Sequence, residues 1–287
     1  MTLRWRQLRD GAVARLTGAG VDDPAQEVLW IVERASGRTP SEQAGSLDEP
    51  ATEREVGFVD QMVERRAAGE PLQYVLGRWA FRQLDLYIDA RVLIPRPETE
   101  VVAGLAIELS GLRDRSPVVV DLGTGCGAIA LSLAAERWPH IEVWGTDASA
   151  DALAVARANL AGLGRRAGVV RLAEGDWFNA LPEDLRGRID VVVSNPPYVA
   201  EGDALPPEVA SWEPREALLA GLDGLADLRR IIADAPLWLA PDGAVVLEIG
   251  ETQGREVAAL ALSAGFRDVT IEPDLAGRDR ALVARLA

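Results

Sequence analysis

The chain from Pro117 onward alternates short apolar segments with segments of helical pattern, and this alternation constrains the fold more than any other feature. The apolar segments are residues 118–122, 141–146, 169–173, 189–193 and 244–249. The helical segments between and after them are residues 128–137, 151–163, 225–239 and 253–264. Such an alternation is typical of a doubly wound, mostly parallel sheet. With residues 269–272 and 281–284 as a closing hairpin pair, we predict an α/β fold with a seven-stranded, Rossmann-like sheet.

Residues 1–74 predict a small helical domain. Apolar side chains recur at helical spacing in residues 5–16, Asp23-Pro24 opens a second helical pattern, and Thr52 with Glu55 is typical of a capping box. No group in this region has a spacing typical of catalysis. Its functional role would be a recognition surface for a macromolecular substrate.

Residues 75–97 predict a β-hairpin linker, and residues 98–287 form the sheet domain. The apolar positions of the linker, partly alternating, are Tyr74-Val75-Leu76, Leu84, Leu86, Ile88 and Val92-Leu93-Ile94. The linker ends in a loop in which Arg96 stands between two prolines and Glu98 follows. Arg96 is open to two interpretations, an ordinary surface charge or a residue of the site.

The segment Ser194-Asn195-Pro196-Pro197-Tyr198 stops the predicted strand 189–193 abruptly, because proline supplies no ladder donor. The stop places these residues at the carboxyl end of a strand, where open α/β sheets bind ligands. The Asn195 amide and the Pro196 carbonyl offer acceptors for a planar –NH2 group, while Pro197 stiffens the loop and Tyr198 offers a flat face. Taken alone, the segment is equally compatible with a strand-ending turn.

The glycine-rich turn 123–127 follows the first strand of the sheet, so its backbone can approach a ligand closely. Its spacing is G-x-G-x-G, with alanine at position 128, where a dinucleotide-binding motif needs its third glycine. This spacing argues against NAD as the cofactor. ATP is disfavoured as well, because the chain has no lysine for an ATP-binding loop. The turn also contains Cys126, a small residue to which we assign no chemical role.

Acidic residues end the next two strands and complete a nucleoside-binding pattern. Asp147 stands where a carboxylate binds the ribose hydroxyls of an adenosine, although it could instead cap a helix. Asp176 offers a carboxylate to the adenine amino group, and Trp177 an indole beside the ring; a simple core position for Trp177 is the alternative. We therefore predict an adenosine-containing cofactor at this edge of the sheet.

Charge and composition limit the kinds of substrate, catalytic site and cellular compartment that remain. The net charge is −15 and every basic residue is arginine, which argues against nucleic acid as the substrate and allows a cationic cofactor or a basic protein partner. One cysteine and one histidine, Cys126 and His140, make a metal site or a Cys-His nucleophile unexpected. The polar amino end and the lack of a long apolar run predict a cytoplasmic protein without a membrane segment.

The order of these segments resembles the class I S-adenosylmethionine-dependent methyltransferases, and more narrowly the release-factor glutamine N5-methyltransferase family (PrmC/HemK). The resemblance runs from about residue 65 to the carboxyl end and rests on residues 70–74, 93–100, 121–131, 194–198, 213–214 and 247–250. Two departures from the family pattern are Cys126, where serine or threonine is common, and the lack of a ribbon glycine in residues 81–84.

The resemblance implies methyl transfer from S-adenosylmethionine to the glutamine of the Gly-Gly-Gln tripeptide in class 1 peptide-chain release factors, by a monomer. The residues that it assigns to the cofactor are Asp121, Gly123, Thr124, Gly125, Cys126, Gly127, Asp147, Asp176, Trp177 and Asn195. Those that it assigns to catalysis are Asn195, Pro196, Pro197 and Tyr198, with Arg96 and Glu98 in a substrate loop. Alternatives are a ribosomal-protein glutamine or a DNA adenine as the substrate, and a noncatalytic scaffold that binds a release factor.

Overall fold

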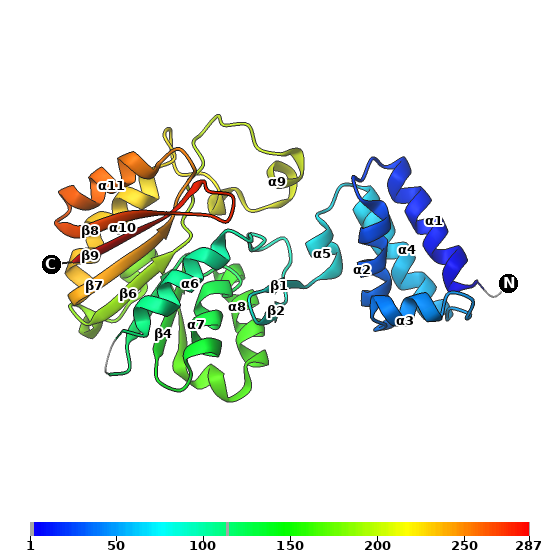
Figure 1. The fold of residues 1–287 in the computed structure, drawn as a ribbon, viewed down its shortest axis with the longest axis horizontal. Coiled ribbons are helices and arrows are strands. Elements are labelled where there is room, and N and C mark those ends of the chain that lie inside the picture. The colour runs from blue at the N-terminus through cyan, green and yellow to red at the C-terminus, as the bar shows by residue number, and fades with distance from the viewer. Residues whose placement is uncertain (1–2, 113–114, 287) are drawn as a thin grey trace. The chain divides into compact units, whose positions relative to one another are not determined.

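The computed structural model describes residues 3–112 and 115–286, which form two compact units. The first contains the residues up to Arg78 together with Pro207–Trp212, and the second contains Trp79–Pro206 and the residues from Glu213 onward. Figure 1 draws both units and labels most of their helices and strands. In the described part of the chain, each helix is too short or too polar to span a bilayer.

The first unit is helical, as predicted. Its helices are α1 (Trp5–Gly18), α2 (Pro24–Ser36), α3 (Pro40–Gly45), α4 (Glu53–Ala67), α5 (Leu72–Leu76) and α9 (Pro207–Trp212). Asp23 caps α2 by accepting from the Gln26 N–H, and Thr52 and Glu55 form a reciprocal capping box on α4. Each such cap contributes about 1 kcal/mol. The apolar faces of α1, α2 and α4 bury side chains such as Leu16, which is fully enclosed.

Two further short helices begin at prolines and were not predicted from the sequence. Thr39 accepts from the Glu42 N–H and starts α3 with Pro40 at its first position, where the missing N–H costs nothing. The second helix, α9, begins at Pro207. A proline can either end one helix or occupy the first position of the next, so the proline alone does not distinguish the two cases. The capping residues beside it decide.

The linker contains a short antiparallel ribbon, β1 (Trp79–Phe81) and β2 (Leu84–Leu86). The strands expected at residues 74–76 and 92–94 are wrong. Residues 74–76 belong to α5, which ends at Gly77 in the left-handed conformation, because a short buried apolar run has no periodicity that separates strand from helix. Residues 92–94 are not part of any strand in the described structure, and the Ile94 N–H donates to the Glu213 side chain.

The second unit contains the predicted seven-stranded sheet, in the order β5-β4-β3-β6-β7-β9-β8. Its strands are β3 (Val118–Leu122), β4 (Glu142–Asp147), β5 (Val170–Glu174), β6 (Ile189–Ser194), β7 (Leu239–Glu248), β8 (Phe266–Pro273) and β9 (Asp279–Leu286). Neighbours from β5 to β7 pair in parallel, and β9 pairs antiparallel to both β7 and β8. Strand β7 starts five residues before the predicted position 244, with a register shift opposite residues 189–191.

Helices cover both faces of the sheet (Figure 1), which explains why β3 and β6 are buried along their whole length. On one face lie α6 (Thr99–Ser110), α7 (Ala128–Arg137) and α8 (Ala150–Gly162), and on the other lie α10 (Ala226–Trp238) and α11 (Gly254–Ser263). Successive β3 residues point to opposite faces, so Val118, Val120 and Leu122 pack in the cluster that contains α10 and α11. The two covered faces leave the carboxyl edge of the parallel strands for the site.

The chain after β6 makes an excursion whose two ends are joined. The Val199 N–H donates to the Leu218 carbonyl at 3.0 Å, and the Ala220 N–H donates to the Val199 carbonyl at 2.9 Å. These bonds form a parallel bridge between residues 199 and 219. The two ends of the excursion, residues 200–218, thus lie at one place in the second unit, and within it only Pro207–Trp212 belong to the first unit.

Candidate active site

A cavity of about 270 Å³ lies at the carboxyl ends of β3, β4, β5 and β6, which meet at one edge because these strands are parallel neighbours. The residues that we predicted for the cofactor and that line this cavity are Asp121, Gly123, Thr124, Gly125, Cys126, Asp147, Asp176, Trp177 and Asn195. Of the remaining predicted catalytic residues, Pro197 lines it as well. Segments far apart in the sequence, from Arg91 to Arg230, thus converge on one cavity.

The glycine turn adopts a backbone that other residues reach only with strain. Gly123, Gly125 and Gly127 have φ values of +70°, +56° and +89°. A Cβ on Gly127 would also come within 2.9 Å of the Leu131 side chain, where α7 begins. Glycine is therefore required at these positions to bring the backbone and the start of α7 to the cavity.

Asp147, the last residue of β4, holds the glycine turn in place. Its Oδ2 accepts from the Gly125 N–H at 2.8 Å, and its Oδ1 accepts from the Ser149 N–H at 2.9 Å. Burial raises the pKa of Asp147, against the lowering effect of these two bonds. Ser149 caps α8 by accepting from the Ala152 N–H, so the capping role considered for Asp147 falls to Ser149.

Asp121 supplies a second carboxyl to the cavity, from within β3. It is 1% exposed, and its Oδ2 accepts from the Thr124 hydroxyl at 2.6 Å and from the Ala130 N–H at 3.0 Å. Its Oδ1 has no hydrogen-bond partner among the described residues. Removal from water raises the pKa of Asp121 to about 7, against the lowering effect of its two donors. A buried acceptor oxygen without a donor fits a site that takes a donor from a ligand.

Trp177 and Asp176 follow β5 and also line the cavity. The Trp177 ring lies against Gly123, and its backbone has a φ of +50°, an uncommon conformation for a bulky residue. Asp176 forms an ion pair with Arg230 of α10. Asp227, one turn earlier in α10, lines the same cavity and was missed from the sequence, where it resembles any first-turn acid of a helix.

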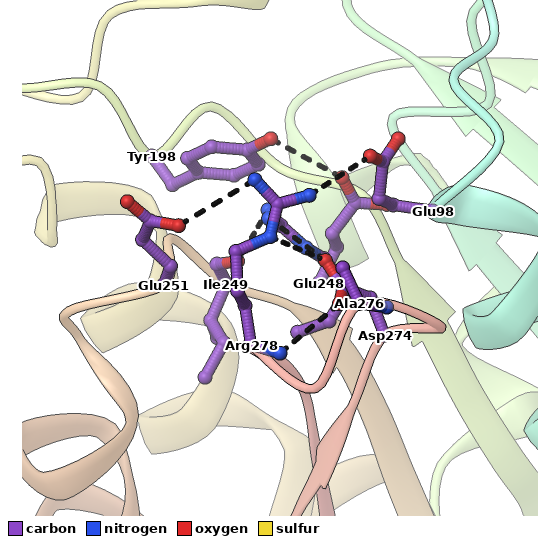
Figure 2. A network of polar contacts seen from close by, with 9 residues as sticks. Glu98, Tyr198, Glu248, Ile249, Glu251, Asp274, Ala276 and Arg278 are labelled. Carbon is purple, nitrogen blue, oxygen red and sulfur yellow. Dashed lines mark hydrogen bonds and ion pairs between the residues drawn. The ribbon is translucent and has the colours of Figure 1, made fainter.

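Some side chains of the Asn-Pro-Pro-Tyr segment line the cavity, and others pack into the interior of the protein. Asn195 donates from Nδ2 to the Thr99 hydroxyl at 3.3 Å, while Pro197 faces the cavity. Pro196 and Tyr198 are not among the described residues that line it. The Tyr198 hydroxyl donates to Oε1 of the buried Glu248 at 3.2 Å (Figure 2), and burial raises the pKa of Tyr198 above its usual range.

The predicted substrate-loop residues make contacts of their own outside the cavity. Arg96 forms an ion pair with the buried carboxylate of Glu213. Glu98 lies 3.4 Å from Arg278, as Figure 2 shows. Neither lines the cavity in the described part of the chain, whereas Thr99, which follows Glu98 and begins α6, does.

Two residues behind the site were missed in the sequence. Glu248 is a fully buried carboxyl at the end of β7, and its signal was an acid inside an otherwise apolar run. Gln253 accepts from the Gly250 N–H and donates from Nε2 to the carbonyls of Tyr198 and Gly224, at 3.0 and 3.2 Å. No local pattern marks the role of Gln253, because the carbonyls of Tyr198 and Gly224 that it binds are 55 and 29 residues away.

Comparison with known proteins places the chain in a family. The model of the PrmC N-terminal domain matches residues 7–77, and the model of the methyltransferase small domain matches residues 99–210. Among solved structures, the hMettl16 catalytic domain superposes with a TM-score of 0.53 at 16% identity, covering 81% of each chain. A methyltransferase from Pyrococcus furiosus gives a TM-score of 0.50 at 20% identity, covering 72% of this chain and 90% of its own. These structures share the fold.

Relatives with curated names match at much higher identity. The release factor glutamine methyltransferase of Cereibacter sphaeroides is 41% identical over 96% of each chain. Proteins of the same name from Moorella thermoacetica and Burkholderia pseudomallei are 41% and 46% identical, covering 99% and 77% of this chain and 98% and 78% of their own. On this identity over nearly its full length, the chain belongs to the release factor glutamine methyltransferase family.

Proposed function

We propose that this protein transfers the methyl group of S-adenosylmethionine to the side-chain amide nitrogen of the glutamine in the Gly-Gly-Gln tripeptide of class 1 peptide-chain release factors. The observation that carries the proposal is that the Asn195 carboxamide lines the same cavity as the glycine turn and the carboxyls of Asp121 and Asp147. Amide-holding and cofactor-holding groups are thus within one site. The names of the relatives supply the class of protein substrate.

The cavity residues fit S-adenosylmethionine. The unpartnered Oδ1 of Asp121 can accept from an ammonium group, and the Asp147 carboxylate has lone pairs left for ribose hydroxyls. Trp177 offers an aromatic face, and Asp176 a carboxylate for the adenine amino group. When bound, this cofactor supplies an electrophilic methyl group on a positively charged sulfur.

The substrate amide would be held by the segment after β6. We infer that its NH2 group donates to the Asn195 Oδ1 and to the Pro196 carbonyl, while Pro197 and Tyr198 flank the amide plane. An amide nitrogen is a weak nucleophile because its lone pair is delocalised into the carbonyl. Two acceptors that hold both hydrogens disfavour that planarity and aim the lone pair, and such orientation can supply several kcal/mol, up to about 7–11.

Proton balance requires no base before the transfer. A carbon–nitrogen bond forms as the carbon–sulfur bond breaks, and the nitrogen then releases one of its two hydrogens as a proton. The hydrogen-bonded acceptors at Asn195 and Pro196 hold these hydrogens until that release. We assign the protein no dedicated general base.

The helical unit is proposed as the part that recognises the protein substrate, since it contributes no side chain to the cavity among the described residues. We further infer that the protein acts as a cytoplasmic monomer on a protein rather than on nucleic acid. The net charge of −15 supports the last point, because phosphate contacts need an excess of cations.

Intact-mass spectrometry of a release factor incubated with this protein and S-adenosylmethionine, followed by peptide mapping, tests the proposal. We expect one added methyl group, located on the glutamine of the Gly-Gly-Gln tripeptide. A methyl group found instead on a ribosomal-protein glutamine would replace the substrate and keep the chemistry. Cofactor binding without transfer to any glutamine-containing protein would favour a noncatalytic scaffold.

A further inference from the structure

Asn159, a buried residue of α8, contacts two segments that lead to the cavity. Its Oδ1 accepts from the Tyr87 N–H at 2.7 Å, and its Nδ2 donates to the carbonyls of Tyr87 and Cys126, both at 2.9 Å. Tyr87 directly follows β2, the second strand of the ribbon, which lies beside α8 (Figure 1), and Cys126 belongs to the glycine turn. One carboxamide thus holds the linker and the glycine turn together.

The partners of Asn159 fix the orientation of its carboxamide. The Tyr87 N–H can only donate and therefore requires Oδ1, whereas the two carbonyls can only accept and therefore require the two hydrogens of Nδ2. The reversed carboxamide would set an oxygen against two carbonyl oxygens in the interior, where an unpaired polar group is costly. Since amide groups do not titrate at ordinary pH, this arrangement is the same in acid and in alkaline solution.

The segment after Tyr87 connects this contact to a wall of the cavity. The Asp89 carboxylate accepts from the Tyr87 hydroxyl at 2.5 Å, and from the Arg91 guanidinium at 2.6 and 2.9 Å. The Arg91 N–H donates to the same carboxylate at 3.1 Å, and the Val92 N–H donates to the Asp89 carbonyl at 3.1 Å. Arg91 and Val92 line the cavity. Residues 87–92 therefore form a tight turn that begins at Asn159 and ends at the cavity.

The glycine turn is held by two side chains at successive residues. Asp147 accepts from the Gly125 N–H at 2.8 Å, and Asn159 binds the carbonyl of the next residue, Cys126. Neither Asn159 nor Tyr87 is among the described residues that line the cavity. Asn159 can therefore act on a bound ligand only through the glycine turn and the linker.

We propose that Asn159 is a positioning residue for the cofactor, which keeps the cavity in its binding shape by fixing the linker to the glycine turn. The inference rests on the proposed function only through S-adenosylmethionine and not through the protein substrate. It has a reciprocal consequence, because a contact that raises the affinity for a ligand is stabilised by that ligand to the same extent. S-adenosylmethionine therefore stabilises the contact at Tyr87, a residue outside the cavity.

Calorimetric titration of S-adenosylmethionine tests the positioning role. Asn159→Leu keeps the approximate size of the side chain and removes its three hydrogen bonds. We expect the dissociation constant to rise about tenfold, as for a site that keeps its binding shape about one tenth of the time. Unchanged affinity in Asn159→Leu would overturn the proposal. Asn159→Ala, which cannot introduce a clash, repeats the titration if Asn159→Leu does not fold.

Gln43→Met is the matched control for a lost buried carboxamide. Gln43 is buried in the helical unit, and its Nε2 donates to the carbonyls of Leu29 and Arg38 at 3.1 and 3.0 Å. Its loss removes comparable hydrogen bonds from a unit that contributes no described residue to the cavity. The affinity of Gln43→Met for S-adenosylmethionine should equal that of the native protein. A tenfold loss in this variant as well would reduce Asn159 to a general support of the fold.

Amide hydrogen exchange of the native protein tests the coupling without any substitution. At saturating S-adenosylmethionine the Tyr87 N–H should exchange about tenfold more slowly, the same factor as in the titration. The Gln26 N–H, which also donates to a side-chain oxygen, that of Asp23 in the helical unit, should keep its rate. A Tyr87 exchange rate that the cofactor leaves unchanged would overturn the proposal.

The positioning role and the proposed function fail on different results. Weakened cofactor binding in Asn159→Leu, with no methyl transfer from the native protein to any release factor, would sustain the positioning role and refute the proposed function. Methyl transfer to the release factor by the native protein, with unchanged cofactor affinity in Asn159→Leu, would support the proposed function and refute the positioning role.

Discussion

Arg96 forms an ion pair with the buried carboxylate of Glu213, 117 residues further along the chain. The same carboxylate accepts from the Ile94 N–H at 3.2 Å, so it holds the loop before α6 by both backbone and side chain. This loop carries Thr99 into the cavity. An arginine that the sequence placed in a substrate loop thus has a partner inside the protein.

Arg96→Ala is expected to lower the free energy of unfolding by about 1–3 kcal/mol, because it leaves the carboxylate of Glu213 buried without its cation. The value is below that of a fully buried pair, since the Arg96 side chain is 31% exposed and that of Glu213 only 1%. Urea unfolding measures it. Arg6→Ala, which removes an arginine paired with Asp48 on the surface, should leave the free energy of unfolding unchanged within the error of the measurement. Native stability of Arg96→Ala together with lost substrate binding would instead favour direct substrate contact.

Asn195→Ala should lower turnover by about 10²–10³, the range for deletion of one preorganised polar contact at a reacting group. Single-turnover methyl transfer to the release factor measures the effect. Asn179→Ala makes the same chemical change at an exposed position outside the cavity and should leave turnover unchanged. Near-native turnover in Asn195→Ala would remove Asn195 from the mechanism.

Asp147→Asn should weaken S-adenosylmethionine binding by about 10- to 100-fold, as expected for the loss of hydrogen bonds to a charged acceptor. The variant places an NH2 group where a carboxylate oxygen now accepts from Gly125 or Ser149, so one backbone donor faces another donor. Calorimetric titration of the cofactor gives the comparison. Asp151→Asn, at an exposed position in the first turn of α8, serves as the control. Equal affinity in both variants would contradict the role of Asp147.

Glu248→Gln should stabilise the protein at neutral and alkaline pH. Burial raises the pKa of Glu248 from 4.5 to about 7, with Thr99, Tyr198 and Arg280 acting against the rise and Glu98 adding to it. Between these pH values the folded protein holds a proton that the unfolded chain has released. The stability contributed by this proton is complete below about pH 4.5 and is lost as the pH rises through 7.

The advantage of Glu248→Gln over the native protein should therefore grow from pH 4.5 to pH 8 by on the order of 3 kcal/mol, at about 1.4 kcal/mol per tenfold change in the ionisation constant. Denaturant unfolding across this range is the measurement. Glu174→Gln, at an exposed position in β5, should show no such trend. A difference that does not vary with pH would mean that Glu248 titrates as an ordinary carboxyl.

Cys126 should resist alkylation in the folded protein. Burial raises the pKa of its thiol to about 12, so the reactive thiolate is scarce at pH 8. Iodoacetamide followed by intact-mass analysis should show no added group on the native protein and one on the protein unfolded in urea. Rapid modification of the folded protein would show that the glycine turn opens to solvent.

Much of the fold follows from local patterns in the sequence. Asp23 and Thr52 start helices where we predicted them, because capping needs only the residue and its next three neighbours. The parallel strands follow from apolar runs buried on both faces. Asn195 and Asp147 line the same cavity because each lies at the carboxyl end of a parallel strand in one sheet. The alternation of strands and helices along the sequence is enough to predict this.

The contacts that complete the site could not be predicted, since they join residues far apart in the chain. The local sequence marks Thr99 only as a possible helix start, whereas its hydrogen bond to Asn195 joins residues 96 positions apart. Glu248 is an acid inside an apolar run, which is unusual, but only the packed sheet shows that it is enclosed. Local sequence gives the position of a side chain along its own element, whereas the partners depend on the register between elements.

The bridge that joins Val199 to Leu218 and Ala220 fixes both ends of residues 200–218 at one place. The later part of this segment belongs to the site, because Glu213 pairs with Arg96 and because Pro214, Glu216 and Ala217 line the cavity. Residues 202–206, before α9, have no such contacts among the described residues. Insertions there should therefore lengthen a closed loop, at about 0.6 kcal/mol for each doubling of its length, and leave the reaction centre intact.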